Sequence, residues 1–94
     1  MSHCPPERLA DVADVVAEVR GWAGVVEKKP AVFYMRGEPF LHFHLLAGER
    51  RCADVKGRTG WLRVDLPQPV PAPTRRRLVR ELRSRYGERL KPKR

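Results

Sequence analysis

The segment from Phe40 to Leu46, FLHFHLL, constrains the fold more than any other part of the chain, because polar and apolar side chains alternate along it. Successive side chains of a β-strand point to opposite faces of the sheet, so His42 and His44 share one face. The apolar residues around them share the other face: Leu41, Phe43 and Leu45. Such a two-faced strand is typical of an antiparallel sheet with one buried face. The face that carries the histidines is where a function could lie.

Three further segments have strand-like composition, and short sequences rich in turn residues separate the four segments from one another. These patterns predict a four-stranded antiparallel meander. The predicted strands span about 31–36, 40–47, 51–56 and 61–66.

The turn residues predict the register between the strands. Pro39 has no N–H group and therefore cannot close a two-residue turn on Gly37 and Glu38. A three-residue loop instead pairs Met35 with Leu41. The same loop pairs Phe33 with Phe43, and three residues in the second turn and four in the third give the other apolar pairs: Leu45–Ala53, Phe43–Val55, Val55–Leu62 and Ala53–Val64. With this register one face of the sheet is apolar throughout.

One helix is predicted before the meander and one after it. Apolar residues recur at spacings of three and four near the N-terminus, which predicts a helix over about 6–22. After a proline-rich connector, 67–73, Thr74 is a suitable N-cap for a helix over about 74–90. The sequence thus predicts a single α+β domain, residues 1–94, with both helices on the apolar face of the sheet.

The predicted register also assembles the second face of the sheet. His44, Asp54 and Arg63 fall in one rung and could share hydrogen bonds, because opposite Cβ atoms lie about 4.5–5.5 Å apart. Aromatic side chains lie among polar ones on this face, as is usual for a binding surface. The candidate binding residues are Tyr34, Arg36, Phe40, His42, His44, Asp54, Lys56, Trp61 and Arg63.

A small-ligand, metal or catalytic site on the His42/His44 face is an alternative function. His42, His44 and Asp54 are the weak candidates for metal ligands, but a further ligand is lacking unless His3 and Cys4 reach across from the N-terminus. Cys52 falls in a different rung from both histidines, so no Cys–His nucleophile pair is expected. No phosphate-binding glycine loop, zinc-protease helix or serine-hydrolase motif occurs. We therefore expect no metal or cofactor, assign no catalytic residue, and lean away from an enzyme.

The net charge of +9 is distributed unevenly. Residues 1–73 sum to +1, whereas residues 74–94 carry ten basic and two acidic groups and sum to +8. A basic segment suits nucleic acid or another polyanion, which is the leading predicted partner, bound through this segment and through the aromatic and basic side chains of the second sheet face. The candidate contacts are Arg75, Arg76, Arg77, Arg80 and Arg83. The alternative is a solvated helix face in which Arg80 and Arg83 pair with the acidic stripe of the first helix. That stripe consists of Glu7, Asp11, Asp14 and Glu18.

The sequence predicts a cytoplasmic protein with no membrane partner. The N-terminal residues lack the basic start and apolar stretch of a signal peptide, and no apolar run approaches the roughly 18 residues of a membrane span. Cys4 and Cys52 form no CxxC pair and are expected to be free thiols in a reducing compartment. Homodimerisation is a further alternative, because small domains with a thin core often gain stability by pairing.

The string FYMRGEPFLHFH, followed by ADV and later by WLRVDLP, resembles the FY-x-RG…FLHFH…ADV core of a group of small bacterial proteins of unknown function. The resemblance covers about Lys29 to Leu66 and is most specific from Phe40 to His44. It implies a shared small α+β fold and carries no activity with it. More remotely, the order of strand, turn, strand, Trp-started strand and helix is similar to that of the MmcQ/YjbR-like proteins. This second likeness is architectural and implies no site residues.

Overall fold

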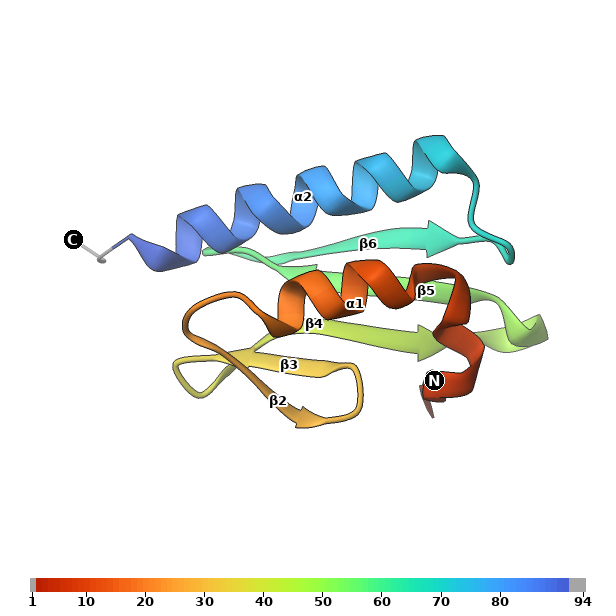
Figure 1. Ribbon diagram of the computed structural model, residues 1–94, viewed down its shortest axis with the longest axis horizontal. Helices are drawn as coiled ribbons and strands as arrows, with labels where there is room; N and C mark the ends of the chain where they lie inside the picture. Colours follow the sequence, from red (N-terminus) through yellow and green to blue (C-terminus); the bar gives the residue numbers. More distant parts are fainter. Residues whose placement is uncertain (1, 92–94) are drawn as a thin grey trace.

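The computed structural model describes residues 2–91, in which two helices cover one face of an antiparallel sheet (Figure 1). The strands are β1 (Ser2–His3), β2 (Val25–Lys29), β3 (Val32–Met35), β4 (Glu38–Leu45), β5 (Arg51–Lys56) and β6 (Trp61–Leu66). The helices are α1 (Ala13–Arg20) and α2 (Ala72–Leu90), with short 3-10 helices η1 (Pro6–Val12) and η2 (Ala47–Glu49). The predicted α+β class is confirmed.

Within residues 2–91 the sheet has six strands rather than the four predicted. The order β2-β3-β4-β5-β6 follows the chain, and β1 pairs with the end of β4. Because β5 occupies one side of β4, β1 and β3 lie along successive parts of its other side. Strand β1 is too short to produce a periodic pattern, and β2 reads VVEKK, which is mostly exposed and shows no clear alternation. Neither strand therefore carries a pattern from which it could be predicted.

The chain turns between β3 and β4 one residue earlier than predicted. Arg36 and Gly37 form a two-residue turn with φ angles of 53° and 79°, and Glu38 pairs with Met35. Two positive φ angles are typical of a type I′ turn, which suits the twist of a hairpin. Since Glu38 closes this turn, the missing N–H group of Pro39 is no obstacle. Two predicted pairs are therefore wrong: Met35–Leu41 and Phe33–Phe43.

A β-bulge moves Phe40 to the buried face of the sheet. Phe33 pairs with Leu41 and Tyr34 with Pro39, so Phe40 is an extra residue in β4. A bulge interrupts the alternation of faces, and the consecutive residues Phe40 and Leu41 are both fully buried. Phe40 is therefore a core residue, which corrects its prediction as a binding residue on the histidine side.

The register between β4 and β5 differs from the prediction by two residues. The loop contains η2 and runs from Leu46 to Arg50, because Leu45 pairs with Arg51. The predicted pairs Leu45–Ala53 and Phe43–Val55 are replaced by Phe43–Ala53 and Leu41–Val55. A shift of two residues leaves every side chain on its own face, so the apolar face is preserved. The predicted pairs between β5 and β6 are confirmed: Val55–Leu62 and Ala53–Val64.

The core lies between the sheet and the helices. Figure 1 shows α1 and α2 side by side on the same face, and the buried apolar side chains of β3 to β6 pack beneath them. Trp22, which follows α1, and Tyr86 of α2 pack against Phe40 with ring centroids 6.4 and 6.3 Å away. The Tyr86 hydroxyl also donates a 2.6 Å hydrogen bond to the carbonyl of Ala23. Aromatic packing thus joins the two helices at one end of the core.

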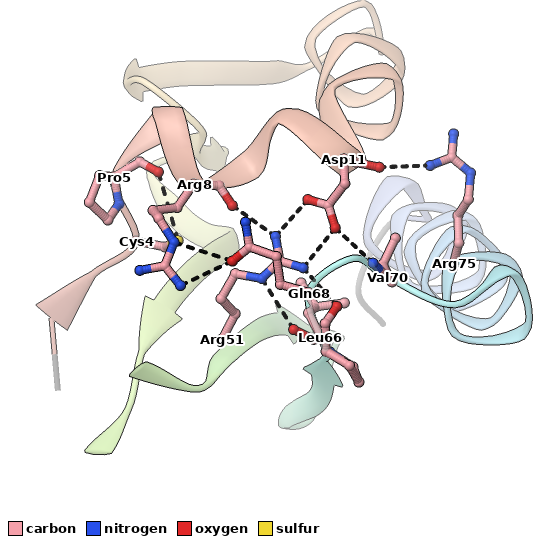
Figure 2. Close-up of polar contacts among 10 residues, drawn as sticks. Cys4, Pro5, Arg8, Asp11, Arg51, Leu66, Gln68, Val70 and Arg75 are labelled. Carbon is pink, nitrogen blue, oxygen red and sulfur yellow. Dashed lines mark hydrogen bonds and ion pairs between the residues drawn. The ribbon is translucent and has the colours of Figure 1, made fainter. Parts of the chain in front are cut away.

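The predicted helix over 6–22 divides into η1 and α1, and α1 ends at Arg20. The backbone is non-helical at Leu9. Beside this residue, the carbonyl of Arg8 accepts a 2.8 Å hydrogen bond from the buried side chain of Arg51 (Figure 2). The same guanidinium donates two hydrogen bonds of 2.7 and 2.8 Å to the carboxylate of Asp11. The irregular turn therefore coincides with the point where a side chain of β5 enters between the residues of η1.

The Arg51 cluster, defined as Arg51, Asp11 and their bonded backbone groups, also holds the connector before α2. Arg51 donates to the carbonyls of Leu66 and Pro67 at 3.2 and 2.8 Å, and the Val70 amide donates to Asp11 at 2.8 Å. Hydrogen bonding from Arg51, outweighing the effect of burial, lowers the pKa of Asp11. One charged pair thus ties η1, β5 and the connector together (Figure 2).

Helix α2 begins at Ala72, two residues before the predicted start at Thr74. Pro71 occupies the N-cap position in place of Thr74, and Pro73 lies in the first turn. Proline is tolerated there because the first N–H groups of a helix have no partner within the helix. The connector is correspondingly shorter than 67–73. Among residues 2–91, no helix combines the length and hydropathy needed to cross a membrane.

Candidate functional site

The face of the sheet opposite the helices is open and carries most of the predicted binding residues (Figure 1). His42 of β4 pairs with Asp54 of β5, which in turn pairs with Arg63 of β6. The large indole of Trp61 is 50% exposed. We call this surface the histidine face and define it as His3, Tyr34, His42, His44, Cys52, Asp54, Lys56, Trp61 and Arg63.

Asp54 is the centre of a hydrogen-bonded network on this face. His44 Nδ1 lies 2.9 Å from Asp54 Oδ2, and Arg63 donates bonds of 2.8 and 2.9 Å to the two carboxylate oxygens. The hydrogen bond from Arg63, followed by that from His44, lowers the pKa of Asp54 despite its burial. Because an ionised carboxylate only accepts, His44 Nδ1 carries the hydrogen, and Nε2 keeps the lone pair in the neutral ring.

The hydrogen bonds predicted among His44, Asp54 and Arg63 are present, although the register that led to them is wrong. His44 lies opposite Cys52 rather than Asp54, and it reaches Asp54 along the diagonal between neighbouring strands. A slip of two residues kept all three side chains on one face. Their proximity was therefore predictable from alternation alone, whereas the identity of the direct neighbours was not.

His42 lies in a group of aromatic rings. Its centroid is 5.6 Å from that of Tyr34 and 5.8 Å from those of Trp61 and His44. The Nε2 atom of His42 is shielded from solvent and has no hydrogen-bond partner within residues 2–91. Burial, with smaller contributions from His3 and His44, lowers the pKa of His42, which favours the neutral ring. A shielded polar atom without a hydrogen-bond partner destabilises a folded protein, so its presence makes His42 a candidate functional residue.

His3 joins the two predicted histidines. Strand β1 pairs His3 with His44, and the His3 ring lies 5.5 Å from that of His42 and 5.4 Å from that of His44. The chain has three histidines, and all of them lie in this one group. A single histidine near the N-terminus belongs to no periodic pattern, so only the residue type could have indicated its role.

Cys52 takes part in the same network, and its side chain there is the protonated thiol. It is fully buried, and burial, followed by the charge of Asp54, raises the pKa of the thiol. Ligand atoms of His44, Cys52 and Asp54 all lie within 4.8 Å of one another. However, Asp54 already accepts hydrogen bonds from Arg63 and His44, and a metal would require the thiolate form of the cysteine. This trio therefore fits a hydrogen-bonded network better than a set of metal ligands.

The other predicted residues lie towards the edges of the histidine face. Lys56 Nζ lies 5.8 Å from the ring centroid of Trp61, and Lys28 Nζ covers the ring of Tyr34 at 4.4 Å. Arg36 lies in the turn after β3 and donates to the carbonyl of Leu90 at 3.4 Å. This contact places Arg36 beside the end of α2, so it is not part of the group around the histidines.

The arginines predicted to contact a polyanion fall into two sets. Arg75 forms an ion pair with Asp14, and Arg83 Nη2 lies 2.9 Å from Glu18 Oε2. The acidic stripe of the first helix thus has the intramolecular role proposed for it with Arg83, but not with Arg80. The second set is exposed and takes part in no ion pair within the described chain: Arg76, Arg77 and Arg80.

No protein-family model, curated protein or solved structure matches this chain.

Proposed function

We propose that the protein binds a polyanion, with a nucleic-acid backbone as the leading ligand, through an arginine patch on α2. The arginine patch consists of Arg76, Arg77 and Arg80. The main support for this proposal is that these three side chains are exposed and have no ion pair among residues 2–91. Arg80 follows Arg76 by four positions and Arg77 by three, so the three lie together on one side of the helix.

The neighbouring arginines contact other residues of the same chain, so they are not counted in the patch. Arg75 and Arg83 pair with acidic residues of α1. Arg89 donates hydrogen bonds to the carbonyls of Met35, Pro39 and Lys56. Like charges three and four positions apart on a helix repel one another. A phosphate group between the patch arginines would relieve this repulsion and can accept two hydrogen bonds from one guanidinium.

The position of the patch favours contact with phosphates over contact with bases. The exposed aromatic residue Trp61 lies on the histidine face, on the opposite side of the sheet from α2. A strand bound along α2 would therefore not stack its bases on that ring. Contacts to phosphates carry no sequence information directly. We expect binding with little sequence preference and a strong dependence on salt.

Fluorescence anisotropy with labelled single-stranded and duplex oligonucleotides at increasing salt tests this function. Three phosphate contacts predict a slope of about −2.7 for the logarithm of the duplex binding constant against the logarithm of salt. The triple variant Arg76→Gln, Arg77→Gln, Arg80→Gln should bind at least tenfold more weakly and show a slope close to zero. No binding of either nucleic acid at low salt would reject the proposed function.

A matched control separates the patch from net charge. The triple variant Lys28→Gln, Lys29→Gln, Arg50→Gln removes the same number of charges from other exposed positions. We expect this variant to bind nearly as well as the wild type. An equal loss in both triple variants would show that the ligand responds to overall charge and would reject the assignment to α2.

Homodimerisation and membership of the group with the FLHFH core stay predictions. Strand β2 lies at the edge of the sheet, and Val26 on it is 54% exposed. An edge strand can pair with a second chain. Sedimentation showing a monomer alone at micromolar concentration would count against a dimer.

A further inference from the structure

The three histidine rings form a nearly equilateral triangle on the histidine face. The centroid separations are 5.5 Å between His3 and His42, 5.4 Å between His3 and His44, and 5.8 Å between His42 and His44. Two neighbouring antiparallel strands, β1 and β4, bring them together. The triangle contains every histidine of the chain.

These separations suit three imidazoles around one metal ion. A metal lies about 2.1 Å from an imidazole nitrogen and so about 3.2 Å from the ring centroid, which puts the centroids of three tetrahedral ligands about 5.2 Å apart. The observed triangle is only slightly larger. The backbone of β1 and β4 therefore already holds the rings at nearly the required spacing, and side-chain rotation is the main adjustment.

Two of the three rings have a nitrogen available for a metal. His44 Nδ1 is held by Asp54, which leaves Nε2 with a lone pair, and His42 Nε2 is shielded without a partner in residues 2–91. Within residues 2–91 the group whose ligand atoms are already close enough for a metal is His44, Cys52 and Asp54, so the three rings must adjust to share an ion. His3 is exposed at the end of a two-residue strand. Its ring can therefore turn towards the other two at little cost.

We propose that His3, His42 and His44 together bind a divalent transition-metal ion, with zinc the expected metal. Three imidazole ligands leave a fourth position open for water or a further ligand, as in catalytic rather than structural zinc sites. Asp54 would orient His44 from behind, since histidine ligands commonly donate their second N–H to a carboxylate. Arg63 in turn fixes Asp54 through two hydrogen bonds of 2.8 and 2.9 Å.

A competing set of ligands on the same face is His44, Cys52 and Asp54, whose ligand atoms are already close. It would require the buried thiol to ionise and Asp54 to give up its bonds to Arg63. It would also leave the unpartnered His42 nitrogen unused. The two sets share His44 but differ in His3 and Cys52, so substitutions at those two positions distinguish them.

Calorimetric titration of the chelator-treated, untagged chain with Zn²⁺ tests the site, with Co²⁺ absorption reporting its geometry. We expect one ion per chain and the visible bands of tetrahedral Co²⁺. His3→Gln, His42→Gln and His44→Gln should each weaken binding by more than the roughly 10- to 100-fold expected for the outer-layer variant Asp54→Asn. Cys52→Ser is the matched control and should bind like the wild type. Absence of binding to the wild type, or unchanged affinity in His3→Gln, would overturn the proposal.

A measurement on the wild type keeps the test valid if a histidine variant fails to fold. Imidazole ¹⁵N spectra should show all three histidine side chains shifting together as one equivalent of Zn²⁺ is added. A shift confined to His3 would indicate adventitious binding at the N-terminus and would overturn the site. Because the arginine patch lies on the other side of the sheet, its triple variant should keep the zinc affinity. Failure of nucleic-acid binding would therefore leave this result unaffected.

Discussion

Arg51 links three segments of the chain through one side chain that is 1% exposed. It contacts η1 through Asp11 and the Arg8 carbonyl, and it contacts the connector through Pro67. We expect Arg51→Met to lower the free energy of unfolding by about 3 kcal/mol, because removing the guanidinium leaves the carboxylate of Asp11 without its charged partner. Urea denaturation followed by circular dichroism measures this change. The exposed neighbour Arg50 provides the control: Arg50→Met should stay within about 0.5 kcal/mol of the wild type. A similar loss in both variants would contradict the role of the cluster.

The carboxylate of Asp11 makes part of this stability dependent on pH. Hydrogen bonding from Arg51 lowers the pKa of Asp11 in the folded state. Ionised Asp11 therefore stabilises the fold above its unfolded-state pKa of about 4, and the stabilisation is lost as pH falls through the lower folded value. We expect Asp11→Asn to be less stable than the wild type at pH 7, with the difference shrinking below about pH 4. Urea titrations of the wild type and Asp11→Asn across this pH range test this expectation. The other acidic groups are present in both proteins, so their effects cancel in the difference. A difference that stays constant with pH would contradict it.

Alternation explains why some site residues were predictable and others were not. His42, His44, Asp54 and Arg63 reach one face under any register that slips by an even number of residues, so the sequence was sufficient to group them. Phe40 could not be placed correctly, because the bulge that turns it inward leaves no mark in the hydrophobic pattern. His3 and Arg51 act through pairing with distant segments, which a local pattern does not record.

The turn between β3 and β4 depends on the backbone freedom of glycine. Gly37 has a φ angle of 79°, and a Cβ atom added there would meet nothing within 4 Å. We expect Gly37→Ala to lower the free energy of unfolding by about 1 kcal/mol, through backbone strain rather than a clash. Gly60 also has open space but no positive φ angle, so Gly60→Ala is the matched control. Thermal or urea denaturation compares the two. Equal effects would contradict the conformational explanation.

The predicted elements were most accurate where a segment packs directly on the core. Strands β4, β5 and β6 and most of α2 have apolar periodicity because one side of each is buried. Strand β2 lies at the sheet edge and exposes most of its side chains, so burial imposes no pattern on it. The prediction of one regular helix over 6–22 is wrong at η1. There Arg51 donates a hydrogen bond to the backbone, a tertiary contact that the local hydrophobic pattern does not record.

The two-layer arrangement of the molecule separates the two proposed functions. Both helices pack on one face of the sheet, so the arginine patch and the histidine face lie on opposite sides (Figure 1). The basic helix and the aromatic side chains of the histidine face, both predicted to contribute to polyanion binding, thus belong to two separate surfaces. The core lies between the two surfaces, so both belong to one folded unit although their ligands would not meet.

The same single core predicts that the molecule unfolds as one cooperative unit. Trp22 reports on the core, because its ring lies 4.7 Å from Tyr86 and 6.4 Å from Phe40, whereas Trp61 reports on the open face. We expect the fluorescence of Trp22, isolated in Trp61→Phe, to change at the same urea concentration as the circular dichroism of the backbone. The fluorescence of Trp61, isolated in Trp22→Phe, should likewise follow that variant's own backbone transition, at lower urea because core packing is lost. If Trp61 changed well before the backbone, the sheet would be opening at β6 independently of the helices, and the two faces would not share one folding unit.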